Sequence, residues 1–509
     1  MLSRLPNAAR LGLWSVLLFA ITLWLGTLHN DFPWYYHPDE PGKVEQVLGT
    51  RPLNFHHPML LLNSAIAAFK LSGAEPNPQT VVQIGRAVSA CFTAAAVALL
   101  SLLAYSWRGW RVAIFAGLAL ATHHQLFELA HYFKEDTALL FGLAVAFVAA
   151  DRHRRNPTLQ NAIALGAGVG LAISGKVPGA LSLLFAVPVF IATRKHCGWR
   201  PAAAAAITAA VVFAATNPQA FANPAAVVEN FNREAKLVTT GQGMTQSVPH
   251  TKYWSILLGN TNPVIWVLIL TAIGAAWRRR AELNVAERCT FIFPFALAIL
   301  MSFLPKENDR YFLPATALFT VIAAAGVADI AKALQRRYRR GVVEIICGTA
   351  LVAGQFISWT DDRAGLLEYM DAFRTDDTAD ALDWLRQNAK STDVIAKDDR
   401  VRLPDERRKS RKARPLPNKV LSDDYVADLG SIEKLRGDGV EFVIVSESTY
   451  KRFERSSLRP KKGGEDDAER RRAFYADLRR SYEPVWSRPR STVIYLHPGI
   501  EIYRISQSN

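Results

Sequence analysis

Two acidic residues stand side by side just after an apolar segment, and carboxylates in that position can accept a proton or hold a cation. Asp39 and Glu40 follow the apolar run LGLWSVLLFAITLWLG after a short aromatic stretch. Adjacent carboxylates beside an apolar face are expected to repel each other, which would raise the pKa of at least one and suit a general base. The pair also fits the start of a short interfacial helix, with Asp39 as N-cap and Glu40 in the first turn.

Many other ionisable and hydrogen-bonding side chains also stand close to the ends of apolar segments. A charged group at membrane depth costs on the order of a few kcal/mol unless it is paired or hydrated, so such a set gathered at one membrane face implies a polar cavity. The set comprises His37, Asp39, Glu40, Lys43, His56, His57, Lys134, Glu135, Asp136, Lys176, His250, Lys252, Lys306, Asp309, Arg310 and Tyr311.

Several members also have a simpler interpretation. His56 and His57, in FHHP, fit an interfacial pair of imidazoles that binds no ligand, and FKED at 133-136 fits a loop with a local ion pair. Lys306 and Arg310 fit contacts with lipid phosphates of the outer leaflet. The order of these residues along the chain is therefore more informative than any one of them.

The elements that must position these residues are membrane-spanning helices. Residues 1 to 358 are dense in Ala, Leu, Val and Phe, whereas residues 359 to 509 are rich in charged residues. A span needs roughly 17 to 25 mainly apolar residues. The sequence predicts about eleven spans, near 11-29, 84-105, 111-128, 136-150, 159-174, 177-193, 201-217, 256-277, 289-304, 311-331 and 341-358.

The basic residues indicate the orientation of these spans. Arg4 and Arg10 precede the first span, and the basic turns RHRR, WRRR and QRRYRR fall on the same side of the membrane. The positive-inside rule makes that side cytoplasmic. The exported side then holds the ionisable and hydrogen-bonding residues named above, the loops at 30-83 and 218-255, and the tail. Much of the net charge of +15 is a topology signal, and no nucleic-acid partner is implied.

The tail, 359-509, alternates helical and apolar strand patterns. DDTADALDWLRQNAK and AERRRAFYADLRRSYEPVW predict helices, and STDVIAKDD, GVEFVIVSES and STVIYLHPGIEIYRIS predict strands. The predicted fold is a polytopic α-helical membrane domain, 1-358, followed by a small soluble α/β domain with a parallel or mixed sheet. Acceptor docking, partner binding and packing over the membrane site are all open roles for this domain.

Two further segments have alternative interpretations. The loop 218-255 contains an amphipathic helix pattern at 225-238 and fits either a lid over a membrane site or an unstructured connector. The basic run DERRKSRKARPLPNK, 405-419, fits either a solvated loop or a contact with anionic lipid or glycan.

Six short motifs occur in an order that resembles the glycosyltransferase C superfamily, in particular the branch of the protein O-mannosyltransferases and lipid A aminoarabinose transferases (glycosyltransferase family 39-like). After the acidic pair they are FHHPMLLLN, GRAVSA, LAHYFKEDTALLFG, GLAISGKVPG, SVPHTKYWSILL and PKENDRYFLPATA. The chain departs from the family pattern at His56 and His57, where Glu and Lys are usual. Together the motifs are specific for the superfamily and not for a particular sugar or acceptor.

The resemblance implies an inverting transfer of a sugar from a polyprenyl-phosphate donor, with membrane lipids around it, to a glycan, lipid or protein acceptor on the periplasmic side of the bacterial inner membrane. It implies Asp39 as the base, Glu40 as its support and Asp136 as a second acid. A divalent ion (zinc, manganese or magnesium) at His56 and His250 is a further expectation. The donor phosphate would contact Lys306, Arg310, Tyr311, Lys176 and Lys134, and the donor or acceptor would contact His57, Arg86 and Tyr253.

Two other classes of function compete with this one. A transporter or flippase of prenyl-linked or anionic substrates would be expected to show inverted repeats and charges near mid-span. The sequence shows neither, and its polar groups gather at one face. An inactive scaffold subunit with the same fold is the third hypothesis.

Overall fold

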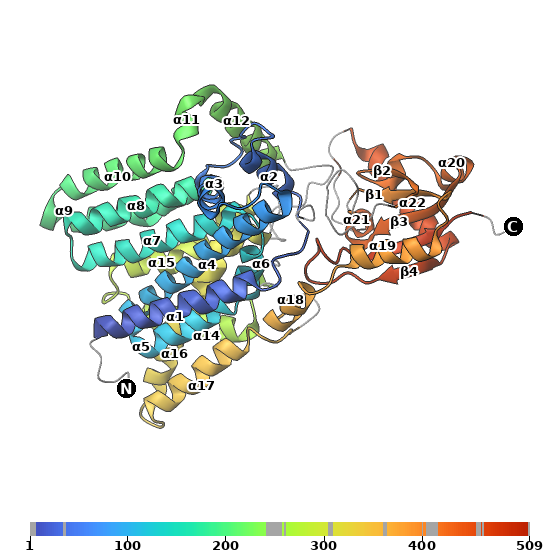
Figure 1. The fold of residues 1–509 in the computed structure, drawn as a ribbon. Coiled ribbons are helices and arrows are strands. Elements are labelled where there is room, and N and C mark those ends of the chain that lie inside the picture. Colours follow the sequence, from blue (N-terminus) through green and yellow to red (C-terminus); the bar gives the residue numbers. More distant parts are fainter. Residues whose placement is uncertain are drawn as a thin grey trace. The chain divides into compact units, whose positions relative to one another are not determined.

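The chain forms two compact units in the computed structural model, which describes residues 7–33, 37–240, 257–258, 261–303, 309–359, 364–399, 401–403, 416–454, 460 and 463–506 (Figure 1). One unit holds Met1–Asn30, Asp39–Lys236 and Pro249–Leu367. The other holds Glu368–Asn509 and two short segments, one of which is Asp31–Pro38. The predicted boundary between 358 and 359 therefore lies close to this division.

The first unit is helical, and helices occupy all of the predicted apolar segments in its described part. The helices are α1 (Asn7–Thr27), α2 (Glu40–Leu48), α3 (Leu60–Ser72), α4 (Pro78–Arg108), α5 (Trp110–Ala121), α6 (His124–Ala130), α7 (Glu135–Arg155), α8 (Leu159–Gly175), η2 (Val177–Ser182), α9 (Leu183–Cys197), α10 (Arg200–Thr216), α11 (Pro218–Ala222), α12 (Pro224–Thr240), α14 (Pro263–Arg278), α15 (Val285–Ser302), η3 (Asp309–Phe312), α16 (Leu313–Leu334), α17 (Arg340–Ala353) and α18 (Leu366–Ala372), which leads into the second unit.

Several of these helices are long and apolar enough to cross a membrane. In the described part of the chain five continuous helical segments meet both criteria: α1, α4, η2 with α9, α15, and η3 with α16. The helices α5 and α6, bent by 55°, make a sixth if the pair counts as one span. Four further apolar helices, α3, α8, α10 and α14, are shorter. A mostly helical membrane body is confirmed, whereas the number of eleven spans stays a prediction.

Small residues bring α7 and α8 into close contact. A Cβ atom at Gly142 would lie 2.2 Å from the Ala172 backbone nitrogen, and one at Gly168 would lie 2.5 Å from that of Ala146. Gly175, at the end of α8, would similarly clash with Leu139 at 2.5 Å. Backbone approach of this kind is how membrane helices associate without a hydrophobic driving force. It also fixes the end of α8 against the start of α7.

The second unit contains a five-stranded mixed sheet in the order β2-β1-β3-β5-β4. β1, β2 and β3 are parallel, whereas β5 is antiparallel to β3 and β4 is antiparallel to β5. The described elements after α18 are α19 (Asp377–Asn388), β1 (Val394–Asp398), β2 (Lys419–Asp423), η5 (Val426–Asp428), α20 (Ile432–Gly437), β3 (Val440–Ser446), α21 (Glu447–Glu454), α22 (Glu465–Ser481), β4 (Pro484–Arg488) and β5 (Ile500–Arg504).

Apolar clusters cover both faces of this sheet. Leu382 and Leu385 of α19 pack with Ile395 on one face. On the other face, α20, α21 and α22 pack on Ala396 and Val443. The predicted strands at STDVIAKDD, GVEFVIVSES and EIYRIS are present. The prediction of a strand at STVIYLH is wrong, because that segment forms a turn before β5.

Asp398 holds the carboxyl end of β1 together with neighbouring elements. Its carboxylate is fully buried and accepts hydrogen bonds from the backbone N–H of Val426 (2.8 Å) and Ser446 (3.1 Å) and from the Tyr475 hydroxyl (2.7 Å). Burial nevertheless raises the pKa of Asp398 to about 6. This acid is part of the core and not an exposed ligand group.

Candidate active site

The first acid of α2 belongs to a buried ion pair. Glu40 and Arg86 are both fully buried, and the Arg86 guanidinium donates two hydrogen bonds to the Glu40 carboxylate, at 2.9 and 2.6 Å. The Phe133 backbone N–H also donates to Glu40, at 3.1 Å. The Phe133 ring fits only because Gly85 has no side chain, since a Cβ there would lie 2.5 Å from the ring. This pair joins α2, α4 and the residues before α7.

Asp39, the other acid of the predicted pair, faces a different set of cations. Asp39 occupies the N-cap position of α2, but its side chain makes no capping hydrogen bond. Its carboxylate instead accepts a hydrogen bond from Lys134 and lies 4.0 Å from an Arg310 nitrogen. The Asp39 side chain is 43% exposed, while the Lys134 side chain is 1% exposed. The capping role is thus replaced by contacts with residues far along the chain.

Asp136 adds a second acid to the same cluster. Lys176, which follows α8, donates a 2.7 Å hydrogen bond to one Asp136 oxygen, and Arg310 lies 3.7 Å from the other. Tyr311 lies beneath both cations, with Lys176 4.9 Å and Arg310 5.9 Å from its ring centroid. We name the set Asp39, Lys134, Asp136, Lys176, Arg310 and Tyr311 the acid–cation cluster.

A smaller ion pair adjoins this cluster; both of its residues belong to the polar set found in the sequence, but the sequence assigned neither of them a role in the site. Lys43 contacts Glu135 at 3.0 Å and donates to the Phe133 carbonyl at 2.8 Å. The pKa of the nearby His57 is lowered to about 4, chiefly because the ring is buried; the charge of Glu135 opposes this shift and that of Lys176 adds to it. His57 is therefore a neutral ring near pH 7. Lys43 and Glu40 are three residues apart on α2, a spacing that places them on neighbouring positions of one helix face.

The segment η3, which carries Arg310, is attached to α6. Gln125 donates a hydrogen bond to the Asp309 carbonyl at 3.0 Å. Gln125 is 3% exposed, so this bond is shielded from water. Because Asp309 immediately precedes Arg310, Gln125 fixes the backbone from which the arginine extends.

Three predicted site residues, Lys306, Tyr253 and His250, lie outside the described residues. In the described part of the chain no three acidic, His or Cys side chains gather as they would around a metal ion. The expected metal needs both His56 and His250, so it stays a prediction. The helix predicted at 225-238 is present as α12, but much of the rest of its loop and most of the basic run 405-419 lie outside the described residues.

Comparisons with known proteins agree with this architecture. Residues 12–202 match the family of dolichyl-phosphate-mannose-protein mannosyltransferases. No curated protein sequence matches the chain at a significant level. The chain resembles the crystal structure of ArnT from Cupriavidus metallidurans bound to undecaprenyl phosphate, with a TM-score of 0.53, 16% identity and coverage of 97% of this chain and 99% of that one.

A second similar structure is the Archaeoglobus fulgidus oligosaccharyltransferase tethered with an acceptor peptide, with a TM-score of 0.51, 12% identity and coverage of 97% of this chain and 74% of that one. Both structures have the fold of glycosyltransferase C membrane proteins. The resemblance of the sequence motifs to this superfamily is therefore confirmed, and the fold is a glycosyltransferase C fold.

Proposed function

We propose that the protein is an integral membrane glycosyltransferase that moves a sugar from a polyprenyl-phosphate donor to an acceptor on the periplasmic side of the bacterial inner membrane. The observation that carries this proposal is the acid–cation cluster, in which three basic side chains and two carboxylates from four separate parts of the chain converge. The likeness of the fold to ArnT, whose structure holds undecaprenyl phosphate, supports a lipid-phosphate donor.

The basic side chains suit the phosphate of the donor. As the bond between the sugar and the phosphate breaks, negative charge grows on the phosphate oxygens. Arg310 would donate to two of these oxygens in its planar fork, and Lys176 and Lys134 would add point charges. Tyr311 keeps Arg310 and Lys176 over its ring. Lys306 is proposed to join them.

Asp39 is the proposed base because it is the more accessible of the two acids. Its side chain is 43% exposed, whereas that of Asp136 is 3% exposed and already bonded to Lys176. An acceptor hydroxyl oxygen would attack the anomeric carbon opposite the phosphate and form the new bond. The phosphate would leave with the electron pair of the old bond, and the hydroxyl proton would pass to Asp39. This single displacement inverts the anomeric configuration.

Glu40 and Arg86 are proposed to position the base. Both oxygens of the Glu40 carboxylate already accept hydrogen bonds, and the pair is closed to solvent. Neither residue has room to contact a substrate. Their bonds fix the first turn of α2, and Asp39 directly precedes that turn.

The test is a transfer assay with the purified full chain in lipid vesicles. Polyprenyl-phosphate sugars would be supplied as donors, and labelled product would be measured for the parent and for Asp39→Ala. We expect transfer by the parent and a near-complete loss in the variant, whose folding would be checked by its melting temperature. Equal rates would end the assignment of Asp39. Donor movement across the vesicle without product would support the transporter, and no change in either donor or acceptor would support the inactive scaffold.

A further inference from the structure

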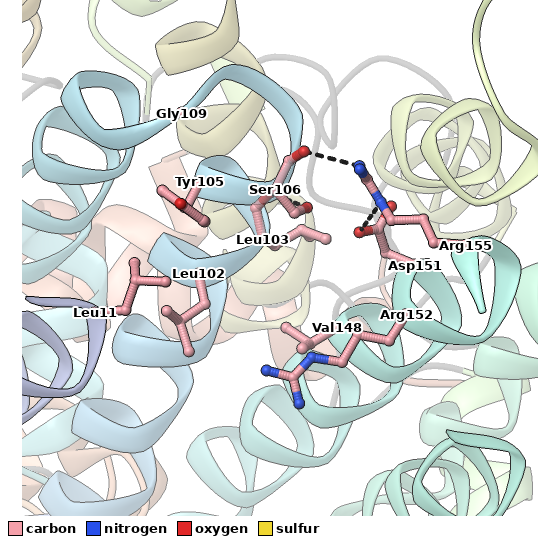
Figure 2. A pocket seen from close by; sticks show the side chains of 10 residues that line it. All are labelled: Leu11, Leu102, Leu103, Tyr105, Ser106, Gly109, Val148, Asp151, Arg152 and Arg155. Atoms are coloured by element: carbon pink, nitrogen blue, oxygen red, sulfur yellow. Dashed lines mark hydrogen bonds and ion pairs between the residues drawn. The ribbon is translucent and has the colours of Figure 1, made fainter. Parts of the chain in front are cut away.

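A cavity of about 480 Å³ lies at the opposite end of α4 and α7 from the acid–cation cluster (Figure 2). Asp151 is fifteen residues after Asp136 on α7, which is about 22 Å at 1.5 Å per residue. This end carries the arginine-rich turns, which the positive-inside rule places on the cytoplasmic side. The cavity is therefore separate from the proposed active site.

One wall of the cavity contains a buried carboxylate oxygen without a donor. Arg155 donates to one Asp151 oxygen at 2.9 Å and to the Ser106 carbonyl at 2.8 Å, as the dashed lines in Figure 2 show. Asp151 is 2% exposed, and its other oxygen, Oδ1, is buried and has no hydrogen-bond partner. An unpaired oxygen of a buried carboxylate is costly, so a donor from a bound molecule would remove a real penalty.

A second charged group lines the cavity separately. In Figure 2 the Arg152 side chain extends away from Asp151, beside Val148. No ion pair of Arg152 is found among the residues that the structure describes. The cavity therefore presents an acceptor for a cationic donor at one place and a free cation at another.

Apart from Tyr105, Ser106 and Gly109, the remaining lining residues of the cavity are leucine and valine, and they adjoin a lipid-facing helix. Leu102 and Val148 line it together with Leu11 of α1. On α1, the neighbouring Leu13 and Val16 are 50% and 67% exposed, as expected for side chains that face hydrocarbon. An amphiphile in the bilayer could thus enter the cavity from the side of α1.

We propose that this cavity binds the headgroup of a phospholipid with a primary ammonium group, phosphatidylethanolamine, from the leaflet at the arginine-rich end. The ammonium donates to Asp151 Oδ1, the lipid phosphate contacts Arg152, and an acyl chain lies along Leu11 and Leu102. Phosphatidylcholine has the same charges, but its quaternary ammonium has no N–H to donate. A purely anionic headgroup would satisfy Arg152 and leave the Asp151 oxygen without a cation.

The experiment is native mass spectrometry of the full chain in detergent with equal amounts of phosphatidylethanolamine, phosphatidylcholine and phosphatidylglycerol of matched chains. We expect phosphatidylethanolamine to be retained about tenfold more than either competitor, the size of effect that a charge-assisted hydrogen bond gives. Asp151→Asn should abolish the preference over phosphatidylcholine, and Arg152→Gln should weaken retention of all three lipids.

Two variants keep the test decisive. Val148→Phe fills the cavity without removing a charge and should also release the lipid, even if Asp151→Asn fails to fold. Arg200→Gln removes an exposed arginine at the start of α10, outside the cavity, and should retain the lipid as the parent does. Equal retention of the three lipids, a preference for phosphatidylglycerol, or parental retention in both Asp151→Asn and Val148→Phe would overturn the proposal.

Discussion

The two ends of α7 both carry clustered charges, but the charges are paired in different ways. At the first end, Lys134, Glu135 and Asp136 each contact a residue of another element. At the last end, Arg155 pairs with Asp151, four residues earlier on the same helix. A local pair costs little chain ordering, because its two residues already lie on one helix face. Convergence of distant residues needs the whole fold, so the charges at the first end are held by tertiary structure, whereas the ion pair at the last end forms within one helix.

The largest expected effect at the first end comes from Asp39→Asn. The side chain keeps its size but cannot accept a proton, so the rate of sugar transfer should fall by about 10²- to 10⁴-fold. Transfer assays in vesicles would measure it. Glu45→Gln is the matched control, since Glu45 is an exposed acid on the same helix and should leave the rate unchanged. If Asp39→Asn transferred sugar at the parental rate, Asp39 would not be the base.

Arg310→Lys tests whether the cations act on the leaving phosphate. It keeps the positive charge and loses the planar fork, so the rate should fall less than with Arg310→Met, for which a loss of about 10²- to 10³-fold is expected. The rates of both variants would be compared at saturating donor. If the two variants had equal rates, bidentate binding of phosphate by Arg310 would be wrong.

Glu40→Gln should affect stability before it affects chemistry. Removal of one partner from a buried ion pair leaves an uncompensated charge and costs about 3–5 kcal/mol. The melting temperature of the full chain in detergent should fall markedly, and the double variant Glu40→Gln, Arg86→Met should recover part of the loss. A melting temperature equal to that of the parent would show that the pair is not a structural anchor.

The ion pair between His497 and Asp377 in the second unit should depend on pH near neutrality. Burial disfavours the charged His497 ring, but hydrogen bonds with Asp377 (3.1 Å) and the Ala372 carbonyl (2.7 Å) raise its pKa above the ordinary value. The stability that the charged His497 ring contributes to the folded state is therefore fully present below about pH 6.5, and it is lost as the pH rises through the raised pKa. Hydrogen exchange of peptides from residues 491–506, corrected for intrinsic rates, should show this loss in the parent and not in His497→Gln. A pH dependence shared by both proteins would contradict the assignment.

The smallest effect is expected at the last end of α7. Arg155→Ala removes an i,i+4 pair in which the arginine side chain is 48% exposed and the Asp151 side chain 3% exposed; it should cost about 1–3 kcal/mol, less than Glu40→Gln, because one partner is already hydrated. The melting temperature of this variant would be compared with that of Glu40→Gln under the same conditions. A loss as large as that of Glu40→Gln would mean that the two ends of α7 do not differ in the way described.

The sequence predicted the helices better than the contacts between them. Apolar runs of suitable length identified α1, α4 and α16, because burial in a membrane needs continuous apolar residues. Glu40 and Arg86 were both recognised as site residues, but their mutual pairing was not, since no local pattern relates residues 46 positions apart. The charge of Arg86 inside an apolar helix was the available hint that a buried acid must face it.

The second unit shows the same limit on a smaller scale. Strongly apolar strands such as β1 and β3 were predicted, but β2 and β4 were not. Both are edge strands of the sheet with mostly exposed residues, so neither has a buried pattern to recognise. The segment before β5 was read as a strand because Val493 and Leu496 are apolar, although they are buried in a turn.

Asp39, the acid after the first helix, and Arg310 of η3 meet in one site, and a cross-linking measurement tests this directly. Cysteines at positions 39 and 310, placed in a chain whose four natural cysteines are replaced by serine, would be treated in native membranes with a series of thiol cross-linkers of increasing length. The tips of the Asp39 and Arg310 side chains lie 4.0 Å apart, so a cross-linker long enough to replace the missing length of the arginine side chain should join the two cysteines, and both should be labelled from the same membrane face. No cross-link, with the two cysteines labelled from opposite faces, would contradict the account.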